Sequence, residues 1–510
     1  MIVDEDPLSG AMRRWAAVIL ASLMLTVPVA PAASAQIGQP DIIQEHWYHS
    51  YATLTLDVNA WADDYPEIVN LSVVGQTEMG RNLWMLQITD ESCWGDLDFD
   101  GCEHLYYGGE GREGPLLLRK EVVYIDGGHH GNEHLGTELA FLVAEHYIEG
   151  WANGDQEVLE VLATTELHIL IMLNADGNDF DTRWNVNQVD LNRNYDHYWN
   201  TCDSTQPGSS AFSESETYAN SIYMNEVVPH ADLYITMHTG VWIMLYPWGK
   251  WPEQPSDWEM FHFIRDDVHA HISDIPIRNA NQGLYPNCGT SRDYGYGVMG
   301  YPTFTFETDD EQFLLGTVEA LSDRLGEELD VMRYLIQDVW YWRARLVADS
   351  LEVEDGKVHL SVSNLGRAST SNATLLYCEN RDSIECWLPG SNEPIEISGL
   401  AQKGGEPQIQ FDSDFNFSAP GYGFSVNATN STVTTLDFTG APISSEGIWV
   451  LYYQKRVVDS SMWVGGPVND SVVESNEGLL QGILPAPSML LVFVAFALAA
   501  INRQNRKFEQ

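Results

Sequence analysis

The chain has 510 residues, and its 25 Lys and Arg residues against 74 Asp and Glu residues give a formal net charge of −49 at pH 7. This balance excludes a nucleic-acid binder that is held by phosphate contacts, because such contacts need many Lys and Arg side chains. Hydrophobic residues make up 44% of the chain and aromatic residues 11%, far more than an acidic disordered chain contains. The chain therefore folds, and its length predicts two or three domains.

The first 35 residues have the pattern of a signal peptide. Arg13 and Arg14 precede the apolar run WAAVILASLMLTVPVA, and small residues suited to cleavage follow at 33–35. We therefore expect residues 1–35 to be removed during export, so that the mature chain begins near Gln36.

The segment from about 36 to 345 has the alternation of an α/β layer fold. Apolar, β-rich runs that predict strands lie at 122–126, 167–173, 233–237 and 303–306. Between the first two runs, apolar residues at helical spacing predict an amphipathic helix over 135–151, and a second helical stretch runs from about 319 to 342. Strands and helices in this order indicate a sheet covered by helices.

The pattern of apolar and polar residues changes after this segment. Short strand-like runs, VHLSVSN, ATLLYCE, FSVNATN and GIWVLYYQKR, are separated by Gly, Pro, Asn and Ser. This pattern predicts an all-β sandwich domain over 346–480.

The C-terminal residues 481–510 predict a membrane anchor or sorting segment. The run from Met489 to Ile501 is apolar, and basic residues follow it, which is the positive-inside pattern. Counted from Gly482, the run reaches about 20 residues, the length that a membrane span needs. The order of LPAPSM, apolar segment and basic tail resembles the C-terminal sorting signals of archaeal surface proteins. The alternative is a C-terminal helix that packs on the protein.

Six cysteines in an exported chain imply disulfides. Short sequence separation favours Cys93 with Cys102 and Cys378 with Cys386, and elimination then leaves Cys202 with Cys288. With the signal peptide, these cysteines predict an extracellular or cell-surface protein.

A polar cluster, DGGHHGNEH at 126–134, lies between an expected strand end and an expected helix start. His130 and Glu133 could direct a nitrogen and an oxygen at one zinc ion. The cluster also spells H-x-x-E-H, the inverzincin pattern, in which both histidines lie on a helix and the Glu is the base. That reading needs a helix through the glycine after His130, at a cost of about 1 kcal/mol relative to Ala, so loop ligands fit better. His129 and His134 are the alternatives to His130.

Further motifs follow in order along the same segment. They are NADG at 174–177, RWNVNQVDLNRNY at 183–195, SESET at 213–217, ITMH ending at His238, Y-x-x-x-G-x-x-x-D from Tyr285, and FTFE ending at Glu307. With YPEIVNLSVVGQTEMGRNL near the start and HGNE, they make the chain similar to the family of zinc metallocarboxypeptidases over about 36 to 345. The resemblance implies a mixed, mostly parallel sheet flanked by helices, and an enzyme that removes single C-terminal residues.

The resemblance also implies the catalytic centre. One zinc ion per chain would be held by His130, Glu133 and His238, which leaves a position for water. Glu307 would be the general base, and Arg183 would stabilise the oxyanion of the scissile carbonyl.

Four further residues match the substrate-binding positions of the family. Asn192 and Arg193 would receive the substrate's C-terminal carboxylate, and Tyr285 would close over it. Arg292 stands where family members have the residue at the base of the pocket for the last side chain, and members with Arg there take acidic ends. The resemblance therefore predicts a preference for C-terminal Glu or Asp. The alternative is that Arg292 turns out of the pocket to pair with a neighbouring acid.

A second metal site is suggested by Asp96, Asp98 and Asp100, which form D-x-D-x-D-G, the first half of a calcium loop. Tyr107 stands where a calcium loop has its bidentate Glu, so a solvated acidic loop is the alternative.

Three functions are compatible with these features. The first is a carboxypeptidase for peptides or proteins with a free C-terminal carboxylate, and Asn192, Arg193 and Tyr285 favour it. The second is a zinc amidase or deacylase that acts on cell-wall or acylated amino-acid substrates. The third is a non-catalytic peptide-binding surface protein, and the complete ligand set with Glu307 counts against it.

Overall fold

The computed structural model describes residues 48–92, 120–202, 206–229, 231–308, 318–379, 385–396, 423–444, 447–453 and 461–464. The expected signal peptide, the proposed calcium loop with Cys93 and Cys102, and the expected C-terminal anchor lie outside these residues. Within them, no helix combines the length and the apolar character that crossing a membrane requires.

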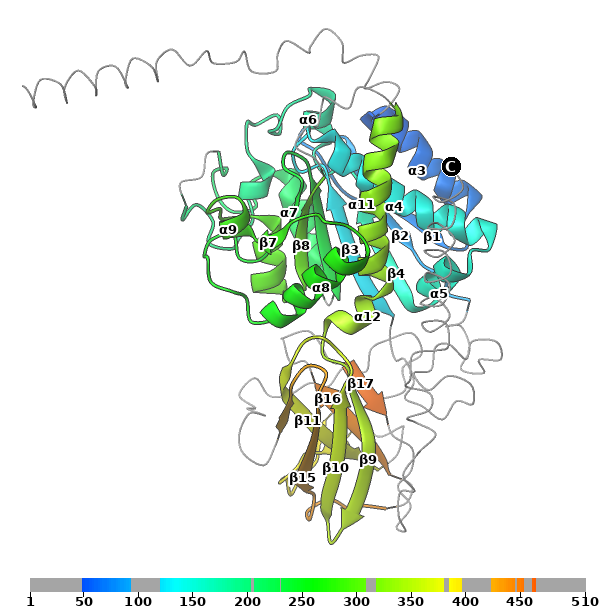
Figure 1. Cartoon of the computed structure of the whole chain (residues 1–510), viewed down its shortest axis with the longest axis vertical. Helices are drawn as coiled ribbons and strands as arrows, with labels where there is room; N and C mark the ends of the chain where they lie inside the picture. The colour runs from blue at the N-terminus through cyan, green and yellow to red at the C-terminus, as the bar shows by residue number, and fades with distance from the viewer. Residues whose placement is uncertain are drawn as a thin grey trace, which may run out of the picture. The chain divides into compact units, whose positions relative to one another are not determined.

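The first part of the described chain is built on an eight-stranded sheet (Figure 1). Its strands are β1 (Val69–Gln76), β2 (Asn82–Ile88), β3 (Glu121–Gly127), β4 (Thr165–Leu170), β5 (Leu233–His238), β6 (Ile243–Tyr246), β7 (Ile277–Asn279) and β8 (Thr303–Glu307), in the order β1-β2-β4-β3-β5-β8-β6-β7. The four central strands, β4, β3, β5 and β8, are parallel to one another. Antiparallel pairings join β1 to β2, β2 to β4, and β8 to β6. The mixed, mostly parallel sheet is confirmed.

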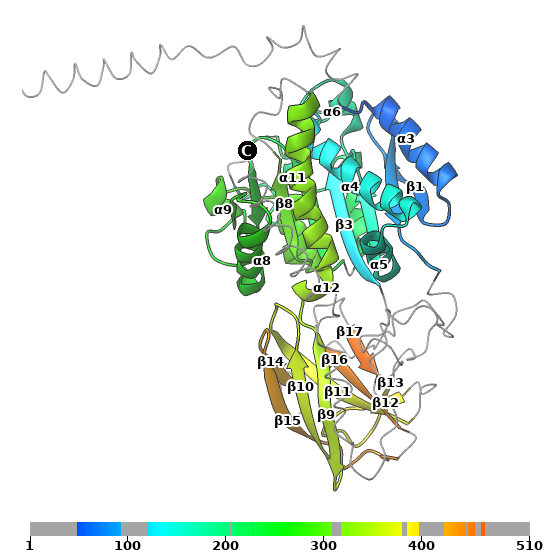
Figure 2. The same cartoon turned by 45° about the vertical axis from the view of Figure 1, so that its right-hand side comes forward.

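Helices and short helical turns precede, connect or follow these strands. They are α3 (Tyr51–Asp64), α4 (His134–Asn153), α5 (Gln156–Thr164), α6 (Ala175–Asp179), η3 (Leu191–Arg193), α7 (Ser215–Glu226), α8 (Trp258–His271), α9 (Ala280–Gly283), α10 (Ser291–Tyr294), η4 (Gly295–Met299), α11 (Val318–Gln337) and α12 (Val339–Trp342). Helix α4 contacts β3 and β5 and packs beside α11 (Figures 1 and 2).

The sheet is covered on both faces. Val123, Tyr124 and Ile125 are consecutive in β3, and all three are fully buried. Because successive side chains of a strand point to opposite faces, both faces are shielded from water. On one face, Tyr124 belongs to an apolar cluster with Tyr223 and Met224 of α7.

The predicted elements are present with shifted ends. The helix predicted over 135–151 is α4, which ends where Gly154 adopts a left-handed backbone with φ 72°. The strand predicted over 167–173 is β4, which ends at Leu170. Beyond it, the chain still follows β3, since the Leu173 N–H donates to the Gly127 carbonyl. The helical stretch predicted over 319–342 is divided at Asp338 into α11 and α12.

The carboxyl ends of the parallel strands bring the motifs together. Strand β3 runs into the HHGNE motif, while β5 ends at His238 and β8 at Glu307, which are paired in register. Gly136 in α4 lets this helix approach the end of β5, because a Cβ at this glycine would lie 2.9 Å from both the backbone N and O of His238. Ligand sites of α/β folds form at this edge of the sheet.

The described residues between Leu346 and Val464 form antiparallel sheets. One sheet holds β15 (Ser431–Asp437), β10 (Lys357–Asn364) and β9 (Leu346–Glu354), and the other holds β13 (Ile395–Glu396), β12 (Glu385–Trp387), β11 (Thr370–Cys378), β16 (Ile448–Tyr453) and β17 (Ser461–Val464), with β14 (Phe424–Val426) paired to β11. Leu360 and Val362 of one sheet share a buried cluster with Leu375, Trp449 and Leu451 of the other. Two sheets around one core make a β-sandwich, as predicted.

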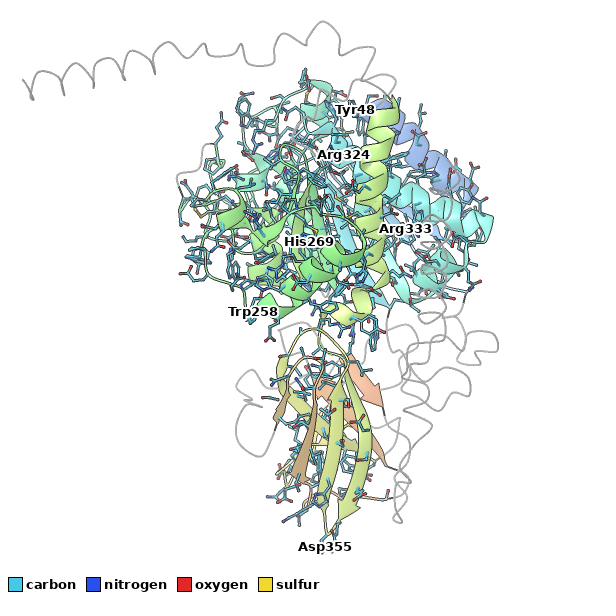
Figure 3. All side chains as sticks on the ribbon, in the orientation of Figure 1. Tyr48, Trp258, His269, Arg324, Arg333 and Asp355 are labelled. Carbon is cyan, nitrogen blue, oxygen red and sulfur yellow. A yellow bond between two sulfur atoms is a disulfide. The ribbon has the colours of Figure 1, made fainter. Side chains whose placement is uncertain are left out.

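A two-residue turn joins β9 to β10. Asp355 and Gly356 both have positive φ, at 49° and 74°, which is the backbone of a type I′ turn. Figure 3 labels Asp355 at this turn. An Asp-Gly pair suits this turn because Gly adopts positive φ without strain and Asp does so more readily than most residues.

Two of the expected disulfides are present. Cys202 is bonded to Cys288, and Cys378 is bonded to Cys386 across β11 and β12. These bonds agree with export to an oxidising compartment.

Glu216, in the first turn of α7, is a buried carboxylic acid with an incomplete set of partners. It is 0% exposed, and Oε1 has no hydrogen-bond partner within the described part of the chain. The amide of Asn185 lies 3.4 Å from Oε2. Burial raises the pKa of Glu216 to about 7.

We expect Glu216→Gln to stabilise the protein at alkaline pH. The folded chain keeps the Glu216 proton up to about pH 7, whereas the unfolded chain loses it near 4.5, so stability falls as pH rises through this window. Gln cannot ionise, so the free energy of unfolding should rise by up to about 3 kcal/mol at about pH 8 and change little at about pH 4.5. Urea denaturation at both pH values measures the difference.

Glu214→Gln is the matched control. The Glu214 carboxylate accepts hydrogen bonds from Asn185, Asn187 and Ser213, so its replacement should destabilise the protein at both pH values. An equal effect of Glu216→Gln at both pH values would contradict the raised pKa.

Candidate active site

Three side chains converge where β3 and β5 end. His130 Nδ1 lies 2.7 Å from Glu133 Oε1, and His238 Nδ1 lies 2.8 Å from Glu133 Oε2. The two Nδ1 atoms are 3.2 Å apart, and all three residues are buried. Two imidazole nitrogens and a carboxylate are the donor set of a catalytic zinc site, in which a fourth position stays open. The predicted zinc site of His130, Glu133 and His238 is confirmed.

The other ring nitrogens of these histidines are also held. His130 Nε2 lies 2.9 Å from Asp190 Oδ1, and His238 Nε2 lies 3.1 Å from Asn192 Nδ2. Partners of this kind fix the orientation of a ligating ring, and a carboxylate also raises its basicity. On Glu133, the backbone N–H of Thr239 donates to Oε2 over 3.2 Å. The ligands are therefore preorganised.

Asp190 is a site residue that the sequence analysis missed. Its Oδ2 accepts hydrogen bonds from Nε and Nη2 of Arg183, at 3.1 and 3.0 Å, while Oδ1 faces His130. Burial alone would raise the pKa of Asp190, but His130, Arg193 and Arg183 hold it well below its usual range. An ionised Asp190 thus links a zinc ligand to Arg183. Its position directly before LNRN was the available signal.

The alternative histidines point elsewhere. His129 Nε2 lies 2.8 Å from the Tyr195 hydroxyl, and His134 Nε2 lies 3.2 Å from Asp181 Oδ1. Helix α4 begins only at His134, so His130 lies in the preceding turn. The inverzincin reading, with both ligands on one helix, is therefore wrong.

Arg183 and Glu307 lie beside the zinc ligands. Arg183 Nη1 donates to Glu133 Oε1 over 3.1 Å. Glu307 is the register partner of His238 across β5 and β8. Burial, followed by repulsion from the Glu133 carboxylate, raises the pKa of Glu307 to about 7. A carboxylate with a pKa near neutrality can both accept and return a proton.

Most of the predicted site residues line one cavity of about 160 Å³. Those that line it are His130, Glu133, Arg183, Asn192, Arg193, Tyr285, Arg292 and Glu307. His238 is not among the lining residues, but it contacts two of them, Glu133 and Asn192.

The residues predicted to bind a carboxylate lie together. Arg193 Nη2 donates to the Tyr285 hydroxyl over 3.2 Å, and Tyr285 is 52% exposed at the mouth. Asn192 Oδ1 accepts the backbone N–H of Ser291 over 3.0 Å, which connects η3 to the start of α10. The arginine and the tyrosine are thus joined by a hydrogen bond where they line the cavity.

Arg292 is buried at the cavity wall and is paired with a neighbouring acid. Its Nε donates to Asp293 Oδ1 over 2.9 Å, Nη1 to Thr305 Oγ1 over 3.3 Å, and Nη2 to Asn287 Oδ1 over 2.8 Å. Arg292 therefore pairs with a neighbouring acid, as the alternative expected, but it does so while lining the cavity and not by turning out of it.

The fold and this site define a zinc-dependent hydrolase. A family model described as zinc carboxypeptidase matches residues 57–323. The chain belongs to the zinc carboxypeptidase family.

Individual relatives are distant. The chain is 22% identical to a carboxypeptidase B of Astacus astacus over 295 residues, which are 52% of this chain and 86% of that protein. It is 22% identical to a carboxypeptidase B of Rattus norvegicus over 292 residues, which are 52% of this chain and 64% of that protein, so it spans slightly less than two thirds of the rat relative. Among solved structures, the carboxypeptidase A of Helicoverpa armigera is 22% identical with a TM-score of 0.45, covering 57% of this chain and 74% of that chain.

Proposed function

We propose that this protein is an exported exopeptidase that removes single C-terminal residues from peptides and proteins, with a preference for Glu and Asp ends. The observation that carries the specificity is the buried guanidinium of Arg292 at the wall of the cavity that also holds the zinc ligands.

The catalytic roles follow from the positions around the zinc ligands. Zinc at this site would supply Lewis-acid activation of water and of the scissile carbonyl. Glu307 takes a proton from the attacking water and returns it to the leaving amine. The guanidinium of Arg183, fixed by two hydrogen bonds to Asp190, stabilises the negative charge that develops on the carbonyl oxygen.

The substrate's terminal carboxylate binds at the mouth of the cavity. Arg193 offers a planar fork of N–H donors that matches two carboxylate oxygens, and Asn192 adds an amide. Tyr285, whose hydroxyl already faces Arg193, covers the bound carboxylate. These contacts place the scissile bond beside Glu307.

Charge in the cavity favours an acidic last residue. Arg183, Arg193 and Arg292 line it, against Glu133 and Glu307. A guanidinium has five N–H donors, and three from Arg292 are used in the contacts with Asp293, Asn287 and Thr305. Two donors remain for a substrate carboxylate, and an arginine–carboxylate pair is a strong charge-assisted interaction.

Arg292→Ile is expected to move the preference from Glu to Leu. The change removes the charged partner of an acidic side chain and lines the pocket with an apolar one, so the ratio of kcat/KM for Glu over Leu ends should fall by well over about tenfold. Matched peptides that end in Glu, Leu and Lys provide the measurement.

Arg278→Ile is the control, because Arg278 is exposed in β7 and does not line the cavity. Its ratio should equal that of the wild type. A wild-type enzyme that already prefers Leu or Lys would rule out the acidic specificity and leave the zinc chemistry standing.

The organisation of the whole chain is part of the proposal. We assign residues 1–35 to a signal peptide, 36–345 to the catalytic domain, 346–480 to the β-sandwich and 481–510 to a membrane anchor. The two disulfides support export. Deleting residues 482–510 should move the protein from the membrane fraction to the soluble fraction, and continued membrane association would contradict the anchor.

One assay separates the proposed exopeptidase from the two other candidate functions. A zinc amidase or deacylase on cell-wall or acylated substrates would leave peptide C-termini intact, and a non-catalytic peptide-binding protein would release nothing. Chelator-sensitive release of single residues from a peptide library distinguishes the exopeptidase from both.

A further inference from the structure

Asn287 connects the two ends of the loop that forms one wall of the cavity. Its side-chain Oδ1 accepts a hydrogen bond from Arg292 Nη2 over 2.8 Å, and its Nδ2 donates to the backbone carbonyl of Tyr285 over 2.7 Å. Asn287 is 6% exposed and lines the cavity. One amide thus contacts both the residue at the cavity wall and the residue that closes its mouth.

The neighbouring segment fits closely around this contact. The backbone N–H of Asn287 donates to the Gly249 carbonyl over 3.0 Å. A Cβ at Gly249 would lie 2.1 Å from Asn287 Oδ1 and 2.2 Å from Arg292 Nη2, so only glycine fits there. Asn287 and Arg292 therefore have little freedom to rearrange.

The hydrogen-bond acceptors around Arg292 include one charged group and two neutral ones, and the Asn287 amide is one of the neutral ones. Asp293 already supplies one carboxylate to the guanidinium, and the Gly249 N–H also donates to that carboxylate. Asn287 and Thr305 complete the contacts with neutral oxygens. A neutral acceptor satisfies an N–H group of Arg292 without cancelling the charge that an acidic substrate needs.

We propose that Asn287 is a specificity-determining positioning residue, which holds the Arg292 guanidinium with an uncharged acceptor and ties it to the Tyr285 backbone. This inference rests on the acidic preference proposed above. It assigns that preference to Arg292 and Asn287 together, because a second carboxylate at position 287 would compete with the substrate for the guanidinium.

The test compares Asn287→Ala with Asn287→Asp. Both variants lose the amide N–H that holds Tyr285, but only Asp adds a negative charge beside Arg292. Steady-state kinetics on matched peptides that end in Glu and Leu give the Glu-over-Leu ratio of kcat/KM. We expect Asn287→Ala to lower this ratio by about tenfold, the value of one hydrogen bond to a charged group, and Asn287→Asp to lower it further. The loss in kcat/KM for Glu ends should appear mainly as a higher KM. The contact with the substrate's last side chain is made in the ground state as well as in the transition state, so kcat should change little.

Which variant has the lower Glu-over-Leu ratio shows whether Asn287 acts through its neutral charge or only through its shape. If Asn287 acts only through its size and shape, the Asp variant, which is nearly isosteric, will stay closer to the wild type than the Ala variant, and that order would overturn the inference. Asn281→Ala is the control, since Asn281 donates to the carbonyls of Gly249 and Lys250 but has no hydrogen bond to Arg292 or Tyr285. It should keep the wild-type ratio, and an equal loss in Asn281→Ala would also overturn the inference.

The wild-type ratio distinguishes the two possible failures. A wild-type enzyme without Glu preference refutes the acidic specificity and the inference with it. A wild-type Glu preference that survives both Asn287 variants refutes the inference alone.

Discussion

Glu307→Gln is expected to lower kcat by at least about 100-fold, the range that loss of a general base produces. Gln keeps the size of the side chain but cannot take a proton from water. The zinc content should not change, because Glu307 is not one of the three converging ligands. Turnover of a peptide substrate and metal analysis of the purified variant measure the two effects.

Glu216→Gln is the matched control for this prediction. Both acids have a pKa raised to about 7 by burial, but Glu216 lies in α7 and does not line the cavity. Its replacement should leave turnover close to that of the wild type. If Glu307→Gln is as fast as the wild type, the base lies elsewhere, and Glu138 is the next residue to change.

His238→Ala is expected to abolish both zinc binding and activity. Within the described chain, His130, Glu133 and His238 are the side chains placed to hold a metal ion, and removing one leaves two ligands for an ion that needs at least three in a catalytic site. The wild type should contain about one zinc per chain, and the variant should lose most of it after dialysis. Metal analysis and peptide turnover on the same sample measure both losses.

His271→Ala is the control, because this histidine is exposed near the end of α8. It should keep the zinc and the activity. Circular dichroism of His238→Ala is needed beside these measurements, since His238 is buried and also contacts Glu133. A folded His238→Ala variant with full zinc and full activity would refute the ligand assignment.

The order of the motifs in the sequence was sufficient to predict the class of the protein. HGNE and the strand-end His238 predicted the zinc ligands, and FTFE predicted the general base Glu307. The structure brings His130, Glu133 and His238 together. This worked because the spacing of a strand end and a following turn is local, and because parallel strands place their carboxyl ends at one edge of the sheet. The alternation of apolar runs predicted the α/β sheet and the sandwich for the same local reason.

The ends of the elements were less predictable. Strand β4 ends at Leu170 and α12 separates from α11 at Asp338, although the apolar pattern continues across both positions. An apolar pattern indicates which residues are buried, but a buried residue can lie in a strand, in a turn or in a helix. The pattern therefore does not fix where an element ends.

The sequence by itself determined the fold class, the zinc ligands and the family, because each depends on local spacing or on motifs in a fixed order. It also predicted two of the disulfide pairings, Cys378 with Cys386 from their short separation and Cys202 with Cys288 by elimination. Only the tertiary structure decided which partners the charged residues take. Asp190 joins His130 to Arg183, and Arg292 is shared between Asp293 and Asn287, where Gly249 from a distant segment leaves room for the contact. Asp190 meets His130, and Gly249 meets Asn287, only because segments far apart in the chain pack against one another. The pairs of Arg183 with Asp190 and of Arg292 with Asn287 are close in sequence, but they depend on the conformation of irregular loops, which leaves no periodic signal in the sequence.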